Sequence, residues 1–118
     1  MEINGTAKLI RVFVGESDKI GRTPVYELIV KQAREHHLAG ATAYRGILGF
    51  GPSARIRSSK ILDLSSDLPM VVEIVDEEQK IDDFIPTLHE LFEKADSGGL
   101  ITVEKVDVIH YVHRANKS

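Results

Sequence analysis

One amphipathic helix constrains the fold of this chain more than any other stretch of the sequence. Between the acidic run 76–78 and the Asp-Ser-Gly-Gly breaker at 96–99, apolar side chains recur every three or four residues. The acids before it complement the dipole at its N-terminus. Such a helix must bury its stripe against another layer, which the rest of the chain has to supply. The stripe consists of Ile81, Phe84, Ile85, Leu88, Leu91, Phe92 and Ala95.

Four β-rich runs can supply that layer, and a further helical pattern separates the first two runs. In this helix Thr23 is the expected N-cap, Pro24 falls in the first turn, and Gly40 is a candidate C-cap. Pro86 lies inside the later helix and is expected to bend it. We expect strands at residues 8–14, 41–50, 70–75 and 100–112.

The element order is therefore β-α-β-β-α-β, which predicts an α+β fold, a ferredoxin-like βαββαβ sandwich. With right-handed crossovers, an antiparallel sheet carries both helices on one face. The opposite face then requires water or a partner. We expect apolar side chains to point outward there, and therefore a homo-oligomer. The outward apolar residues are predicted to be Ile10, Val12, Val71 and Val108.

The overall composition excludes several classes of function. A length of 118 residues predicts a single domain over 1–118, with a polar tail at about 113–118. The net charge of −3 argues against nucleic-acid binding. The absence of cysteine excludes disulfides and thiol catalysis. No run is apolar enough to embed in a membrane, and no secretory signal is visible, so we expect a cytoplasmic protein.

A long connection at residues 52–68 separates the second and third strands and is rich in cations, and Gly46, Gly49 and Gly51 lead into it. Glycines let backbone N–H groups approach a ligand, and guanidinium groups bind phosphate bidentately. The alternative is a solvated loop whose arginines keep the sheet edge soluble. The length and the glycines favour a ligand or partner role. The candidate ligand residues are Gly49 and Gly51 at the entry to this loop and Arg55, Arg57 and Lys60 within it.

Two further segments bear on this loop. Residues 61–64, within the loop, are apolar enough to form a short strand or an apolar clip. Gly98 and Gly99 precede the last strand, and by themselves they indicate a helix end and a turn. In a functional interpretation they form a second anion nest that faces the long loop of a neighbouring subunit. Neither a Walker motif nor a dinucleotide fingerprint is present.

The sequence contains no assembled catalytic or metal-binding set. His36 and His37 are neighbours on a helix, and His110 and His113 would lie on opposite faces of a strand. No serine is paired with a histidine in a way that indicates a nucleophile and its base. The acidic run 76–83 is interpreted as a solvated helix start. We therefore expect a protein that is not an enzyme.

Several motifs along nearly the whole chain resemble the PII-like family catalogued as domain of unknown function one-ninety. The wider similarity is to the PII signalling proteins, which share the element order. The motifs are Gly46-Ile-Leu-Gly-Phe-Gly51, Ile61-Leu-Asp-Leu64, Leu68-Pro69, Val72-Glu-Ile-Val75 and Gly99-Leu-Ile-Thr-Val-Glu104.

The resemblance implies a homotrimer that binds an adenine nucleotide, AMP or ADP, between subunits. Gly98 and Gly99 would face the loop glycines and cations across each cleft, and the loop would bind a membrane transporter or an enzyme. PII proteins carry lysines where this chain has Met70 and Leu100, which disfavours ATP and favours AMP. The loop has no tyrosine for uridylylation.

Two other functions remain open at this point. One is a trimeric divalent-metal-binding protein akin to the cation-tolerance proteins of the same fold, which would take up metal through histidines or carboxylates. The other is a small phosphate-processing enzyme, which would turn over a substrate. The histidine spacing and the missing acid–base set make both of them secondary to the nucleotide-binding regulator.

Overall fold

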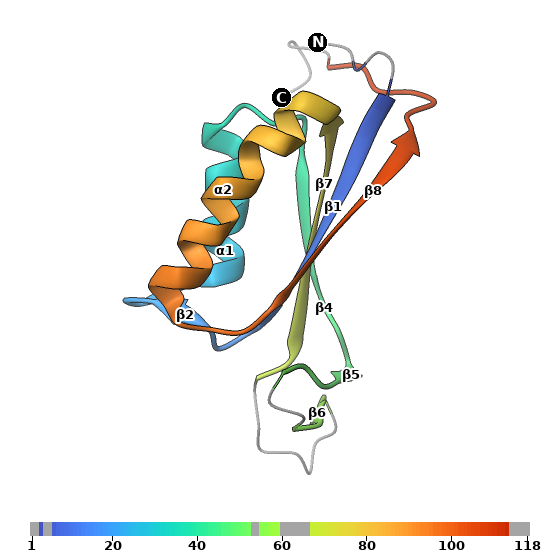
Figure 1. Cartoon of the computed structure of the whole chain (residues 1–118). Coiled ribbons are helices and arrows are strands. Elements are labelled where there is room, and N and C mark those ends of the chain that lie inside the picture. Colours follow the sequence, from blue (N-terminus) through green and yellow to red (C-terminus); the bar gives the residue numbers. More distant parts are fainter. Residues whose placement is uncertain (1–2, 4–5, 53–54, 60–66, 114–118) are drawn as a thin grey trace.

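The computed structural model describes residue 3 and residues 6–52, 55–59 and 67–113 of the chain (Figure 1). Two long helices and four principal strands follow one another in the predicted order. Two short hairpins, β2–β3 and β5–β6, are added to this frame. The elements are β1 Thr6–Gly15, β2 Lys19–Ile20, β3 Thr23–Pro24, α1 Val25–Glu35, β4 Ala41–Arg45, β5 Leu48–Gly49, β6 Arg57–Ser58, β7 Pro69–Glu77, α2 Glu78–Ala95 and β8 Leu100–Asp107.

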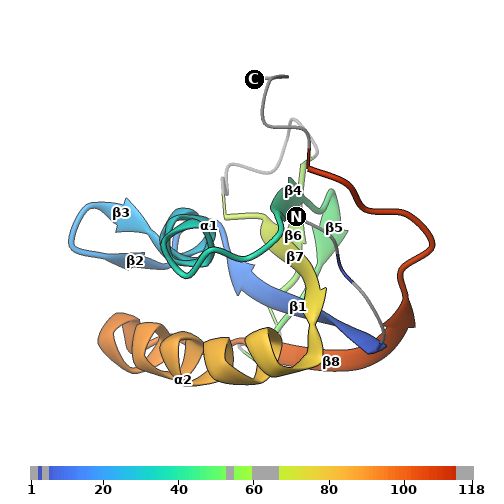
Figure 2. The same ribbon diagram turned by 90° about the horizontal axis from the view of Figure 1, so that it is seen from above.

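The four principal strands form one sheet in the order β4-β7-β1-β8, and every neighbouring pair is antiparallel. β1 lies between β7 and β8, so the first and third principal strands are central and the other two form the edges. Both helices pack on the same face of this sheet (Figure 2). The predicted ferredoxin-like sandwich is thus confirmed.

The core lies between the sheet and the two helices. Ile81, Phe84 and Leu88 of α2 are fully buried, as their periodicity predicts. Each such side chain stabilises the fold by about 1.5–3 kcal/mol. The two helices also meet through the His36 and Phe84 rings, whose centroids lie 5.3 Å apart in an edge-to-face arrangement. The sheet contributes Ile10, Val12, Val14, Met70, Val72 and Ile74, and α1 contributes Val25, Ile29 and Ala33.

The outer face of the sheet, which the helices do not cover, carries a mixture of charged and apolar side chains. The Arg11 guanidinium donates to Glu73 at 2.8 Å and to Glu104 at 2.6 Å. The Arg11 hydrogen bond, assisted by one from Tyr44, holds the pKa of Glu73 below its ordinary value. Strand alternation places Leu9, Phe13, Tyr44 and Val71 on this same face.

The predicted set of outward apolar residues was therefore partly wrong. Ile10 and Val12 are completely buried beneath the helices, and Val108 lies beyond the end of β8. Both faces of β1 carry apolar residues, so alternation alone could not show which of them the helices cover. Val71 is the member of the predicted set that does belong to the outer face.

The ends of α1 also differ from the prediction. Thr23 lies in β3 and caps nothing, since the helix begins at Val25 and no side chain hydrogen-bonds its first turn. The helix ends at Glu35, five residues before Gly40. The left-handed residue that follows it is His37, with φ of 59°, and not a glycine. The His37 N–H donates to the Arg34 carbonyl and the Leu38 N–H to the Ala33 carbonyl, so His37 takes the C-cap place that a glycine often fills.

Two predicted strands end earlier than their composition suggests. The second stops at Arg45, and the residues after Gly46 turn into the separate hairpin β5–β6. The last stops at Asp107, so His110 and His113 are not on a strand. The expected feature at 61–64, the polar tail beyond 113 and Lys60 lie outside the described residues.

Asp76 contradicts the interpretation of residues 76–83 as a solvated helix start. It is the last buried residue of β7, only 2% exposed. Its carboxylate accepts the Ala39 N–H at 2.8 Å and the Glu77 N–H at 2.7 Å. This carboxylate therefore joins the end of β7 to the connection that enters β4.

Candidate ligand cavity

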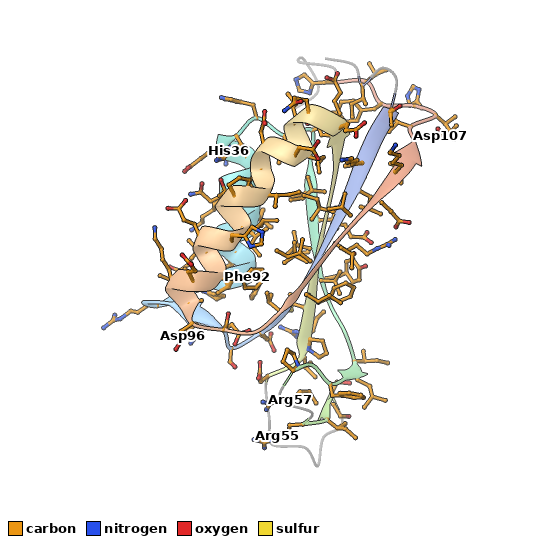
Figure 3. The ribbon with its side chains drawn as sticks, viewed as in Figure 1. His36, Arg55, Arg57, Phe92, Asp96 and Asp107 are labelled. Carbon is orange, nitrogen blue, oxygen red and sulfur yellow. The ribbon has the colours of Figure 1, made fainter. Side chains whose placement is uncertain are left out.

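A cavity of about 490 Å³ lies where β1, β7 and the β5–β6 hairpin meet. This is the end of the molecule opposite Asp107, and Arg55 and Arg57 lie there (Figure 3). The volume falls within the usual range of small-molecule sites. The cavity is lined by Phe13, Val14, Gly15 and Asp18, by residues 46, 48–52, 55 and 57, by Asp67, Leu68, Pro69 and Val71, and by Gly98.

The β5–β6 hairpin builds one wall, and Pro69 positions it. The Gly46 N–H donates to the Pro69 carbonyl at 2.7 Å, after which the chain leaves the sheet. Gly49 then pairs with Arg57 across the hairpin. A Cβ on Gly49 would lie 3.1 Å from Pro69 Cγ, so a residue without a side chain lets the hairpin rest on this proline.

Positive and negative charges balance among the described lining residues. Arg55 and Arg57 are matched by Asp18 and Asp67. Arg57 Nη2 lies 3.2 Å from Asp67 Oδ2, and both side chains are largely buried. Asp18 accepts the N–H of Gly15 at 2.8 Å. The cavity can therefore offer guanidinium groups to an anion, but it does so beside two carboxylates.

The structure brings most of the predicted ligand residues together in one chain. Gly49, Gly51, Arg55, Arg57 and Gly98 all line the cavity. A Cβ on Gly98 would lie 3.1 Å from Pro52 Cγ, so the glycine turn meets the loop entry of its own chain. Lys60 lies outside the described residues. The role of these residues in binding a ligand stays a prediction.

Gly99 is a neighbour of the cavity and does not line it. A Cβ there would lie 2.6 Å from Phe92 Cε1 and 2.9 Å from the Phe13 carbonyl oxygen. The absence of a side chain at this position is therefore required by packing between α2 and β1. Of the two glycines predicted to form an anion nest, only Gly98 lines the cavity.

Sequence reasoning missed the two acidic lining residues. Asp18 lies three residues after β1 and Asp67 directly precedes the Leu68-Pro69 entry to β7, so each follows or precedes a strand end. Residues at the ends of neighbouring strands converge in space. Their positions beside strand ends were the sequence feature that could have identified them, although neither residue belongs to a recognised motif.

Large apolar side chains are exposed around the same end of the molecule. Ile47, Leu48, Phe50 and Ile56 are 63–74% exposed; Ile47 directly precedes β5, and the others belong to the hairpin or the segment that joins its strands. Leu100, at the start of β8, is also exposed. A group of this kind is typical of an interaction surface.

A second cavity, of about 520 Å³, lies between the end of α1 and Tyr111. Arg34, His37 and His113 line it, and the Tyr111 hydroxyl donates to the Ala39 carbonyl at 2.9 Å. Its wall includes the carboxyl end of a helix, whose dipole disfavours anions. The cavity at the hairpin is therefore the stronger candidate for an anionic ligand.

Within the described ranges, no three histidine or acidic side chains are close enough to hold a metal ion. Neither helix there is long and apolar enough to span a bilayer.

Comparison with known proteins gives a consistent family assignment. The model of the family DUF190, described as an uncharacterized ACR, matches residues 7–108. A UPF0166 protein of Aquifex aeolicus is 42% identical over 103 residues, covering 87% of this chain and 93% of the relative. A UPF0166 protein of Methanocaldococcus jannaschii is 33% identical over 97 residues, covering 82% and 86%.

Among solved structures, the fold matches CPII, a nitrogen regulatory PII-like protein from Thiomonas intermedia K12. CPII bound to ADP, AMP and bicarbonate superposes with a TM-score of 0.66 at 13% identity, over 88% of this chain and 89% of CPII. CPII bound to ADP and bicarbonate gives 0.65 at 15% identity over the same shares. At these identities the likeness establishes a PII-like fold.

Proposed function

The chain belongs to the DUF190 family, and from that premise we propose that it is a PII-like regulator that binds an adenine nucleotide and catalyses no reaction. It acts as a homotrimer with the nucleotide, AMP in preference, in the clefts between subunits. One observation carries this proposal: Gly49, Gly51, Arg55, Arg57 and Gly98 meet around one cavity. The fold that brings them together is the one that binds ADP and AMP in CPII.

The preference for AMP follows from the charges at the cavity. Two arginines face two aspartates among the described lining residues, so little net positive charge is available for a long phosphate chain. Met70 and Leu100 stand where PII proteins carry lysines. Met70 is buried, and Leu100 pairs with Phe13, a residue of the cavity wall. Neither of these two positions supplies a positive charge to the cavity.

The trimer is supported by two surfaces that a single chain leaves uncovered. The outer face of the sheet carries the partly exposed Leu9 and Phe13 and the exposed Tyr44 around the Arg11–Glu73–Glu104 cluster. The exposed apolar side chains of the hairpin lie beside the cavity. A neighbouring subunit that covers both surfaces would also close the open side of the cavity.

Signalling in this proposal runs through the loop at residues 52–68. Its first residues and its last both line the cavity, so a ligand there contacts both ends of the loop. Ligand binding can change the affinity of the loop for a partner only if the loop states bind the ligand with different affinities. The partner proposed is a membrane transporter or an enzyme.

The test is the double variant Arg55→Ala/Arg57→Ala, titrated with AMP by calorimetry. Hydrogen bonds to charged groups contribute about 1.5–3 kcal/mol each, so affinity should fall at least tenfold. Arg22→Ala/Arg34→Ala removes the same charge from positions outside this cavity and should bind as the wild type does. Equal affinity in the two double variants would remove the loop arginines from the site.

A further inference from the structure

Asp67 holds one of the two arginines of the cavity and is itself fixed from two sides. Its Oδ2 lies 3.2 Å from Arg57 Nη2, and its Oδ1 accepts the Ser17 N–H at 2.9 Å. The two charged side chains are only 22% and 19% exposed, so water screens the pair incompletely. Arg57 therefore already has an anionic partner supplied by the protein.

A second carboxylate lies close to the first. A Cβ on Gly15 would be 3.0 Å from Asp67 Oδ1 and 3.2 Å from Asp18 Oδ2, so both carboxylates converge on this residue. Asp18 is fixed there by the Gly15 N–H, which it accepts at 2.8 Å. All three residues line the cavity. Any anion that reaches Arg57 enters next to two negative charges.

The geometry points to Asp67 as the residue that limits how much phosphate charge the cavity accepts, an inference that rests on the proposed function. A phosphate group at Arg57 must share the guanidinium with Asp67 or displace it. Each further phosphate adds negative charge near Asp67 and Asp18, and like charges at such distances repel. Asp67 thus lowers affinity for all nucleotides, and for a triphosphate more than for a monophosphate.

The same contact connects the ligand to the loop. Arg57 belongs to β6, near the beginning of the 52–68 loop, and Asp67 lies at its end, next to β7. Their ion pair therefore joins the two ends of the loop at its base. A phosphate that takes Arg57 from Asp67 replaces this ion pair with a contact to the ligand, so the paired and unpaired states of Arg57 bind the ligand with different affinities.

The experiment compares Asp67→Asn with the wild type in calorimetric titrations with AMP and with ATP. Asparagine keeps an oxygen that can accept the Ser17 N–H, but it removes the negative charge opposite Arg57. We expect AMP affinity to rise about threefold or more and ATP affinity to rise further, so that the AMP-to-ATP preference shrinks. Asp67→Glu, which keeps the charge, should retain the wild-type preference.

Asp82→Asn is the matched control, since it changes the net charge equally but at Lys8, where β1 meets α2. If Asp67→Asn loses its fold by circular dichroism, Asp67→Ser removes the same charge and takes its place. Wild-type affinities in the folded variant, with AMP binding intact, would overturn the inference and leave the proposed function standing. Failure of every protein to bind any nucleotide would overturn both.

Discussion

At the start of β8, the Phe92 ring and the Phe13 carbonyl leave no room for a side chain on residue 99. The two neighbouring glycines, Gly98 and Gly99, therefore have different roles. Gly98 opens toward the cavity, whereas Gly99 lets the strand pass beneath α2. The sequence marks both residues equally, because a Gly-Gly pair reveals neither which residue faces the cavity nor which packs.

The first prediction concerns this packing. Gly99→Ala places a methyl group 2.6 Å from Phe92 Cε1, so the ring or the strand must move. Overpacking of this kind costs about 1–3 kcal/mol in the free energy of unfolding, which urea denaturation measures. Gly40→Ala is the control, since nothing lies within 4 Å of its Cβ position. An unchanged midpoint for Gly99→Ala would show that the contact is not restrictive.

A second residue-scale prediction concerns the buried carboxylate of Asp76. Asp76→Ala leaves the N–H groups of Ala39 and Glu77 without the acceptor that they have now. An unsatisfied buried donor costs about 1–3 kcal/mol, so thermal unfolding should occur several degrees lower. Glu93→Ala, at an exposed position of α2, should change the melting temperature little. Equal melting temperatures would indicate that water replaces the carboxylate.

At the scale of elements, hydrophobic periodicity located α2, β1 and β7 well, because each buries one regular stripe or alternating face. Periodicity failed to predict the length of a strand where that length depends on pairing with another segment of the chain. β8 ends at Asp107 because Asp107 pairs with Thr6, the first residue of β1. The second strand stops at Arg45 because the chain then pairs with β6 and rests on Pro69. These strand ends are set by pairing with distant segments, so the local sequence alone does not predict them.

The outer face of the sheet carries a prediction on pH. Because Arg11 lowers the pKa of Glu73 in the folded state, the carboxylate stabilises the fold above its unfolded pKa of about 4.5. This contribution is lost as the pH falls through the lower folded pKa. Glu73→Gln should therefore be less stable than the wild type at pH 7, and the gap should close below pH 4.5. Urea titrations at pH 7 and pH 3.5 measure it; a constant gap would contradict this account.

At the scale of the whole molecule, the order of helices and strands was sufficient to predict the topology, since right-handed crossovers leave few arrangements. The cavity was predictable only in part. Its glycines and arginines are conspicuous along the chain, but Asp18 and Asp67 reach it from distant strand ends. Which face of β1 points outward was also beyond prediction, because both faces are apolar.

Assembly is the prediction that belongs to this scale. Tyr44 lies on the outer face and is 45% exposed. Tyr44→Asp adds a negative charge beside Glu73, with which Tyr44 now interacts. In a trimer joined through this face the charge should cause dissociation to monomers, which light scattering with size-exclusion chromatography detects. Lys31→Asp, exposed on α1, should leave the assembly intact. A trimer that persists in Tyr44→Asp would place the interface elsewhere.

The most direct measurement for the central claim is calorimetric titration of the wild-type protein, at a mass fixed by light scattering. AMP, ADP, ATP and cyclic AMP would each be tested with and without magnesium. The account predicts a trimer that binds close to one nucleotide per subunit, with AMP preferred over ATP. An intact trimer that binds none of the four, or that binds ATP most tightly, would contradict it.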